Sequence, residues 1–214
     1  MCNCFRSRGG RTTTETHRAP AWGADLPLSE EEARARLIAA AEQCFLERGP
    51  SRTKVTHVAV KAGVHRTTVY SYFANMDELR VACFVKATTA VVDAAEPFFA
   101  AEGPFIDRLI NGALAGLHAA RTSPTMRTMT TPEELARTHH VAEQSEAWRA
   151  EVVDRLAERF ATAEPGEVRT DVPVHVLAQW VVRICFSLIE EPAGPEIGGD
   201  EGLLRTFLPR TITP

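Results

Sequence analysis

The sequence predicts an all-α protein, and three observations lead to that fold class. Apolar residues recur at helical spacing, as Val55, Val58, Ala59 and Ala62 do at positions i, i+3, i+4 and i+7. No alternation of apolar and polar residues with a period of two runs long enough to indicate a sheet. Capping residues and prolines divide the chain into stretches of helical length. With 214 residues, the chain is long enough for a buried core in one or two domains.

Local signals set the expected ends of the helices. Ser29 is followed by three glutamates, and a hydroxyl with acidic neighbours stabilises the positive end of a helix. Pro97 is expected to end the fourth helix, because proline has no backbone N–H and clashes with the preceding turn. The segment 132–162 reads as one long helix, with a break near His139 left open. Helices are therefore expected at residues 29–48, 54–61, 65–72, 76–95, 104–121, 132–162, 172–190 and 200–208.

The segment from Val55 to Phe73 carries the strongest functional signal. Its two short helical patterns meet at Gly63, a residue that adopts the left-handed conformation at a helix end without steric cost. Thr53 precedes the first pattern, where its hydroxyl is expected to cap the helix. Val69 and Phe73 share the inward face of the second pattern. Two such helices joined by a glycine turn are typical of a helix-turn-helix, whose second helix enters the major groove of DNA.

Polar and basic side chains cover the outer face of that second pattern. No acidic residue lies between Arg48 and Met76, although the whole chain has a formal net charge of −4. The first 80 residues are net positive and the remainder is net negative, so one end of the molecule suits phosphates. The alternative is a solvated basic hairpin in some other all-helical protein. The DNA-binding candidates are Arg52, Thr53, Lys54, His65, Arg66, Thr67, Thr68, Tyr70 and Tyr72.

Three blocks of sequence resemble the DNA-binding domain of TetR-type transcriptional regulators, the TetR/AcrR family. They read LIAAAEQCFLERG, T-K-V-x-x-V-A-x-x-A-G-V and T-V-Y-x-Y-F-x-N-x-D-E-L, within residues 32–84. The resemblance implies that Thr53 caps the second helix and touches a phosphate. It implies that Tyr70 contacts the DNA backbone and that Arg66 meets phosphate or base.

The resemblance also implies how the chain is divided. An N-terminal three-helix DNA-binding domain with a helix-turn-helix would precede a C-terminal helical ligand-binding and dimerisation domain. We therefore expect a disordered basic tail at 1–28, the DNA-binding domain at 29–75, and the effector-binding and dimerisation domain at 76–214.

Three positions depart from the family pattern. His65 stands where a capping serine is usual, Thr67 where glycine is usual, and Met76 where a lysine commonly contacts a phosphate. Thr67 adds a side chain where the helix approaches the bases most closely. Asn75 is positioned to cap the fourth helix in place of the lysine contact. We therefore expect this chain to prefer an operator sequence that differs from those of other family members.

The C-terminal domain is expected to bind a hydrophobic or aromatic effector and a second copy of the chain. Residues 172–190 are apolar nearly all round, which a helix tolerates when it is buried on most sides. Both a two-fold interface and the centre of the monomer provide such burial. The expected interface residues are Val176, Trp180, Ile184, Leu188, Leu204 and Phe207. The candidate cavity residues, each of which also suits an ordinary core or surface position, are Phe84, Phe105, Leu109, Leu117, His118, Met126, Met129, Gln144, Trp148 and Trp180.

The N-terminal tail and the cysteines suggest neither a metal nor a cofactor. Cys2 and Cys4 form a lone C-x-C, without the second Cys or His pair that a zinc site needs. Neither a membrane-spanning run nor a secretory signal is evident, so a cytoplasmic location is expected. The tail arginines, which either reach DNA or form a passive tail, are Arg6, Arg8, Arg11 and Arg18. The cysteines expected to be reduced core residues are Cys44, Cys83 and Cys185.

No catalytic signature competes with the regulatory interpretation. The chain has no G-x-S-x-G, no phosphate-binding glycine loop, no H-E-x-x-H and no paired C-x-x-C, so no enzyme is expected. The expected function is a homodimeric repressor that binds a double-stranded DNA operator and leaves it when a small hydrophobic effector binds. A DNA-binding regulator of the same fold without an effector is the alternative. A helical enzyme or adaptor is a more distant one.

Overall fold

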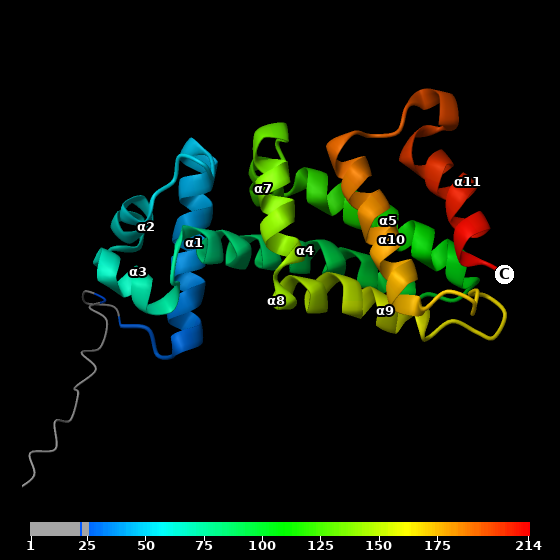
Figure 1. The fold of residues 1–214 in the computed structure, drawn as a ribbon, viewed down its shortest axis with the longest axis horizontal. Helices are drawn as coiled ribbons and strands as arrows, with labels where there is room; N and C mark the ends of the chain where they lie inside the picture. The colour runs from blue at the N-terminus through cyan, green and yellow to red at the C-terminus, as the bar shows by residue number, and fades with distance from the viewer. Residues whose placement is uncertain (1–21, 23–25) are drawn as a thin grey trace, which may run out of the picture.

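The all-α prediction is confirmed. The computed structural model describes residue 22 and residues 26–214, and these residues form helices and no strand. The molecule is elongated, with three helices at one end and a larger helical body at the other (Figure 1). The expected tail arginines and the C-x-C pair lie outside the described residues.

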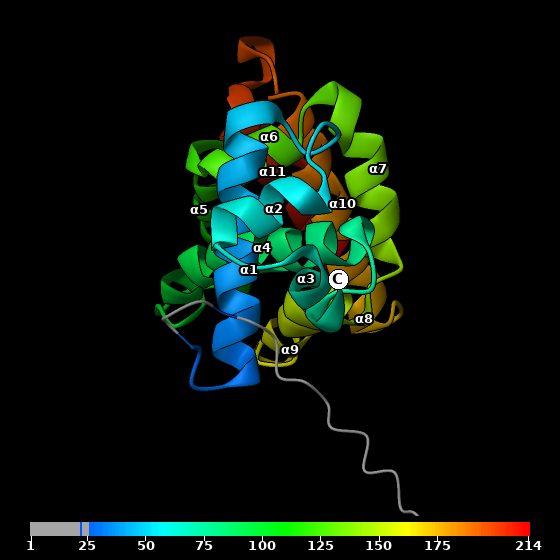
Figure 2. The same cartoon turned by 90° about the vertical axis from the view of Figure 1, so that its left-hand side faces the viewer.

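The N-terminal end, called the head from here on, consists of α1 (Glu30–Arg48), α2 (Val55–Ala62) and α3 (Arg66–Tyr72). Apolar side chains of all three helices meet in one core, among them Phe45, Val58 and Val69, each at most 1% exposed. Gly63 ends α2 with φ 69° and ψ 28°, the left-handed conformation that the turn requires. Figure 2 views the head end-on and shows α2 and α3 in front.

The expected helix caps are correct at two positions and wrong at one. The Ser29 hydroxyl accepts a hydrogen bond from the Glu32 N–H at 3.1 Å, and Asn75 Oδ1 accepts one from the Glu78 N–H at 2.8 Å. Thr53 does not cap α2, because the residue at the N-cap is Lys54. The Thr53 hydroxyl donates instead to the carbonyl of Gly49 at 2.8 Å. This bond stabilises the C-terminal end of α1.

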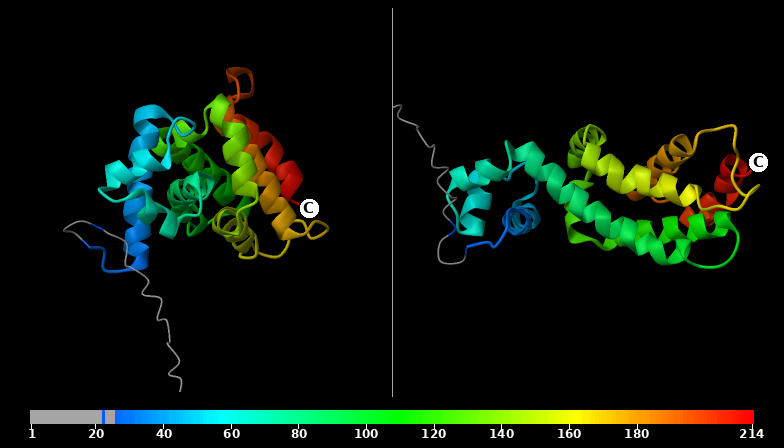
Figure 3. Two further views of the ribbon diagram at one scale, coloured as in Figure 1. Left: turned by 60° about the vertical axis from the view of Figure 1, so that its left-hand side comes forward. Right: turned by 90° about the horizontal axis from the view of Figure 1, so that it is seen from below.

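Helix α4 (Met76–Phe99) leaves the head and runs through the body (Figure 3). The expectation that Pro97 ends this helix near residue 95 is wrong. Pro97 is exposed and lies in the last turn of the helix, where its missing N–H leaves a single carbonyl without a donor. The helix therefore continues to Phe99, and the Ala100 N–H still donates to the Glu96 carbonyl at 3.2 Å.

The body packs further helices around α4, with α5 (Phe105–Thr122) as its most extensive partner. Two glycines of α5 face α4. A Cβ at Gly112 would lie only 3.1 Å from the Phe99 ring, so this glycine allows the close approach of the two helices. The remaining elements are α6 (Pro124–Met129), α7 (Pro132–Glu143), α8 (Glu146–Arg149), the π-helical turn η1 (Ala150–Asp154), α9 (Arg155–Phe160), α10 (Val174–Glu190), the 3-10 turn η2 (Pro195–Ile197) and α11 (Gly199–Ile212).

Three boundaries in the body differ from expectation. The long helix expected at 132–162 is divided, and the break falls after Glu143 rather than near His139. Ser145 makes the break, since its hydroxyl accepts the Trp148 N–H at 3.2 Å and starts a new helix. Helix α6 was not expected, and α11 extends to Ile212 because Pro209, like Pro97, lies near a helix end.

A buried ion pair joins the head to the body. Arg80 of α4 and Glu134 of α7 are 2.7 Å apart, and their side chains are only 4% and 8% exposed. The other carboxylate oxygen of Glu134 accepts the backbone N–H of Ser51, in the loop between α1 and α2, at 2.7 Å. Burial alone would raise the pKa of Glu134, but these bonds from Ser51 and Arg80 lower it overall. One carboxylate thus connects α7, α4 and the head.

Among the described residues, no helix is both long and apolar enough to span a membrane.

Replacing Glu134 by alanine is expected to lower the free energy of unfolding by about 3–5 kcal/mol, because the buried Arg80 would lose its close partner and keep only Asp77, 4.0 Å away. Urea denaturation of the whole chain measures this change. Glu133→Ala, at the exposed neighbouring position, is the matched control and should cost less than about 0.5 kcal/mol. An equal, small effect of both substitutions would contradict the role given to Glu134.

Candidate functional site: a basic recognition helix and an apolar cavity

Helix α3 is held in place from both ends. At its N-terminus, the His65 Nδ1 and the Thr67 hydroxyl are 2.9 Å apart, so two positions that depart from the family pattern contact each other. At its C-terminus, Arg34 of α1 donates to the Tyr72 carbonyl at 2.5 Å, and its guanidinium lies 4.2 Å from the centroid of the Phe73 ring. The Trp22 and Tyr72 rings pack edge to face with their centroids 6.1 Å apart.

The candidate DNA-binding residues fall into an exposed group and a buried group. Thr53 and Thr68 are 5% and 3% exposed, so they serve the core of the head. Tyr72 is half-buried against Trp22, whereas Tyr70 is 51% exposed. The candidates whose side chains lie on the surface are Arg52, Lys54, His65, Arg66, Thr67 and Tyr70.

The basic residues of the head differ in whether they have an acidic partner. Glu47 forms ion pairs with Arg48, at 3.4 Å, and with Lys61, so these two basic residues are partly neutralised. Within the described part of the chain, Arg52, Lys54 and Arg66 form no ion pair. These three cations are exposed on the head without an acidic partner, which suits contact with a phosphate backbone.

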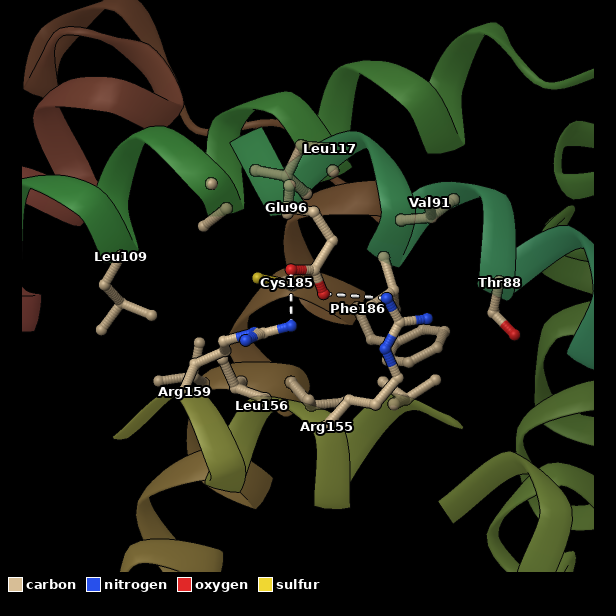
Figure 4. A pocket seen from close by; sticks show the side chains of 18 of the residues that line it. Thr88, Val91, Glu96, Leu109, Leu117, Arg155, Leu156, Arg159, Cys185 and Phe186 are labelled. Carbon is tan, nitrogen blue, oxygen red and sulfur yellow. Dashed lines mark hydrogen bonds and ion pairs between the residues drawn. The ribbon is translucent and has the colours of Figure 1, made fainter. Parts of the chain in front are cut away.

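The body contains a cavity of about 120 Å³ between α4, α5, α9 and α10 (Figure 4). Its wall is mostly apolar, and glycine at positions 112 and 116 leaves space on the α5 side. Large apolar residues of the wall include Val91, Phe99, Leu109, Leu117, Met126, Leu156, Val181, Phe186 and Ile189. Such a wall excludes water from a bound ligand and favours an apolar body.

Three of the expected cavity residues line this cavity, namely Leu109, Leu117 and Met126. Phe84 and Trp148 lie behind the wall, with ring centroids 6.3 and 5.8 Å from that of Phe186. The other expected residues are not in the lining. Phe105 also lies behind the wall, with its ring centroid 6.4 Å from that of Phe99. Met129 is buried elsewhere, Trp180 is half-buried, and His118 and Gln144 are exposed.

Sequence reasoning missed the polar part of the cavity. Glu96 of α4 accepts hydrogen bonds from Arg155 at 2.8 Å and from Arg159 at 2.6 Å, one on each carboxylate oxygen. Figure 4 shows both guanidinium groups reaching from α9 toward Glu96. Arg155 also pairs with Asp93 at 2.9 Å and with Glu151. The four-residue spacing of 151, 155 and 159 was the available signal, since it places these side chains on one helical face.

The environment fixes the protonation of two groups in the cavity wall. Burial raises the pKa of Glu96, but the hydrogen bonds from Arg155 and Arg159 outweigh it and lower that pKa overall. Burial raises the pKa of the Cys185 thiol to about 12. Cys185 is therefore a protonated, unreactive part of the wall. Within the described residues, no group of His, Cys, Asp and Glu side chains is arranged to hold a metal ion.

The expected interface residues divide between the core and the surface of the single chain. Leu188 and Leu204 are 4% and 1% exposed, so they already belong to the core of one chain. Val176 and Phe207 are 41% and 48% exposed, and Trp180 and Ile184 are half-buried. Exposed apolar side chains of α10 and α11, here called the apolar strip, thus remain at the surface of the single chain. Figure 1 shows that both helices belong to the body, away from the head.

Comparison with known proteins places the head in a family. Residues 37–83 match the model of bacterial regulatory proteins of the tetR family, a stretch that covers α2, α3 and part of α1 and α4. An uncharacterised HTH-type transcriptional regulator of Mycobacterium tuberculosis is 27% identical over 187 residues, which cover 84% of this chain and 85% of the relative. The similarity to the relative therefore extends through the body.

Solved structures share the fold. The TetR family repressor AlkX from Dietzia sp. superposes with a TM-score of 0.63 at 19% identity, over 84% of this chain and 96% of AlkX. RolR in complex with resorcinol gives a TM-score of 0.65 at 15% identity, over 86% of this chain and 88% of RolR. Identities this low establish a common fold and nothing more specific.

The lowered pKa of Glu96 leads to a prediction about pH. A carboxylate with a lowered pKa in the folded state stabilises the fold above its ordinary pKa, and this contribution is lost as the pH falls through the lowered value. Glu96→Gln should therefore destabilise the chain at neutral pH, and the difference from the wild type should shrink near pH ~3. Urea denaturation at both pH values measures it, with Glu102→Gln at an exposed position as control. A difference that does not change with pH would refute this account.

Proposed function

Since this chain is a TetR-type transcriptional regulator, we propose that it acts as a homodimeric repressor, released from its DNA operator when a small apolar effector binds. The observation that carries this proposal is the course of α4. One end of that helix packs in the head, and its other half lines the cavity through Thr88, Val91 and Glu96. A ligand that changes the position of α4 would therefore change the position of the head.

In this proposal, the exposed face of α3 reads the operator. Arg52, Lys54 and Tyr70 contact the phosphate backbone, while Arg66 and Thr67 lie nearest the base edges. His65, which contacts Thr67, orients its hydroxyl toward the groove. Thr53, Thr68 and Tyr72 support α3 from inside the head, and their contribution to binding is indirect.

Dimerisation follows from the geometry of DNA. Two recognition helices must reach successive major grooves, which are about 34 Å apart along the duplex. The exposed strip with Val176 and Phe207 on α10 and α11 is the surface that we propose for the two-fold contact. It is apolar and distant from the head, so two heads remain available to DNA.

The effector would occupy the cavity between α4, α5, α9 and α10. RolR, which shares the fold, is known in complex with resorcinol, a small aromatic molecule. The cavity of this chain is likewise lined by apolar and aromatic side chains, including Phe99 and Phe186. We therefore expect an apolar or aromatic effector of small size.

Arg66→Ala tests the recognition helix. The substitution removes one cation from the exposed face of α3, so binding to the chain's own promoter region should weaken. The slope of log K against log salt concentration should fall by about 1, as expected for one lost phosphate contact. Fluorescence anisotropy at several salt concentrations measures both. Arg149→Ala, at an exposed arginine of α8 outside the proposed two-fold contact, is the control with the same charge change. Equal binding by the two variants would rule out α3 as the reading element.

Phe207→Glu tests the dimer. A charge on the exposed apolar strip should shift the equilibrium from dimer to monomer. At a two-fold contact, the new carboxylate would be buried close to the same carboxylate of the second subunit, and the two would repel each other. Sedimentation equilibrium measures the mass, and operator affinity should fall together with it. Phe98→Glu, at another exposed phenylalanine that is 37% accessible, serves as control. A monomeric wild type, or a dimeric Phe207→Glu variant, would refute the assigned contact.

A further inference from the structure

We propose that the cavity binds a compact apolar molecule that carries one neutral oxygen acceptor, and that the arginine pair Arg155 and Arg159 recognises this oxygen. The inference rests on the effector role proposed above and specifies the class of ligand. It is argued from the size of the cavity, from the polar groups on its wall, and from the charges behind them.

The volume limits the ligand to about one ring. The cavity measures about 120 Å³, and a buried apolar cavity of ~150 Å³ is known to hold benzene. Glycine at positions 112 and 116 provides part of this space next to Phe99 and Val91. A ring with one short substituent therefore fits within this space.

Only one part of the wall offers a polar contact to such a ligand. The Thr88 hydroxyl donates to the carbonyls of Phe84 and Val85 at 2.8 and 2.9 Å, so it has no proton left for a ligand oxygen and can only accept. The Cys185 thiol stays protonated and is a weak donor. The remaining polar side chains of the lining are Glu96, Arg155 and Arg159.

These three residues present hydrogen-bond donors rather than acceptors. Both carboxylate oxygens of Glu96 already accept an arginine, at 2.8 and 2.6 Å. The Nε of Arg159 is buried and has no acceptor among the described residues. Because an arginine has five N–H donors, a ligand oxygen placed beside Arg159 gains a charge-assisted hydrogen bond. A purely apolar ligand leaves that donor without a partner.

The charges behind the wall favour a neutral oxygen. Arg155 is shared by Glu96, Asp93 and Glu151, so three carboxylates surround two guanidinium groups. A carboxylate on the ligand would add a fourth negative charge to this group. An ammonium group on the ligand would have to compete with both arginines for Glu96. A ketone, aldehyde or alcohol avoids both costs.

The same contact gives the ligand a route to α4. Glu96 belongs to α4, whereas both arginines belong to α9, so their ion pairs hold the two helices together beside the cavity. An oxygen that bonds to the Nε of Arg159 uses a donor that Glu96 leaves free, because Glu96 is paired with the other end of the same guanidinium. Ligand binding thereby acts on α4 through the guanidinium that links α9 to Glu96.

Four molecules of nearly equal shape test the inference. They are acetophenone with a neutral oxygen, cumene without a polar group, benzoate with an anionic group and 1-phenylethylamine with a cationic group. Calorimetric titration of the whole chain without DNA gives each dissociation constant. Acetophenone should bind about tenfold or more tightly than cumene, as expected for a hydrogen bond to a charged donor. Cumene binding as tightly as acetophenone, the amine or benzoate binding best, or no binding by any of the four overturns the inference.

Variants assign the contact to particular residues. Arg159→Met should remove the preference for acetophenone over cumene while cumene still binds, and Arg149→Met, an exposed arginine of α8 outside the lining, should leave the preference unchanged. Glu96→Gln removes one of the three carboxylates, so the affinity for benzoate should rise relative to the affinity for acetophenone. An unchanged preference in Arg159→Met, or no gain for benzoate in Glu96→Gln, counts against the inference. Circular dichroism establishes that each variant is folded.

The titration is independent of the proposed repressor function. If acetophenone binds but operator affinity stays the same, the effector mechanism fails while the ligand class stands. If an operator is bound and none of the four molecules is, the ligand class fails while the DNA-binding role stands.

Discussion

The position of the head depends on one buried carboxylate. Glu134 bonds to Arg80 of α4 and to the Ser51 N–H of the head, and both partners are at 2.7 Å. A buried ion pair gives little net stability but makes wrong arrangements costly, because any displacement leaves a charge without its partner. The pair therefore acts mainly on geometry: it restricts α7, α4 and the loop after α1 to one mutual arrangement. Without such a restriction, movement of α4 in the body would not reach the head as a defined rotation.

Two polar clusters contact α4, one near each end: the Arg80–Glu134 pair and the Glu96–Arg155–Arg159 cluster. Near its start, Arg80 is fixed by a partner that is only 8% exposed, whereas Glu96 near its end is held by arginines that are 25% and 35% exposed. Solvent weakens the second cluster relative to the first. The part of α4 beside the cavity is thus the part that is easier to displace. A helix fixed firmly at one end and loosely at the other converts a local contact into a tilt.

Features that depend on neighbouring residues could be predicted from the sequence, and features that depend on distant ones could not. The caps at Ser29 and Asn75 and the left-handed Gly63 are local, and all three are correct. The prediction that Pro97 ends α4 was wrong. The energetic cost of a proline in a helix depends on whether the carbonyl left without a donor can bond to water, and the fold decides that. The Glu96 cluster joins residues about 60 positions apart, and no local pattern links them. Thr53 combines a local feature and a non-local one. Its place just before α2 was expected, but its hydrogen bond to the Gly49 carbonyl at the end of α1 was not.

The glycines of α5 have a consequence for how this regulator can diverge. A Cβ at position 116 would lie 3.5 Å from Val91, an ordinary contact, whereas one at position 112 would press on the Phe99 ring at 3.1 Å. A single codon change at Gly116 would therefore fill part of the cavity without forcing α4 and α5 apart. The shape of the cavity can therefore change by small steps while the packing of α4 on α5 and the structure of the head stay as they are. Under the proposed function, the ligand and the DNA sequence that this chain recognises could then evolve separately.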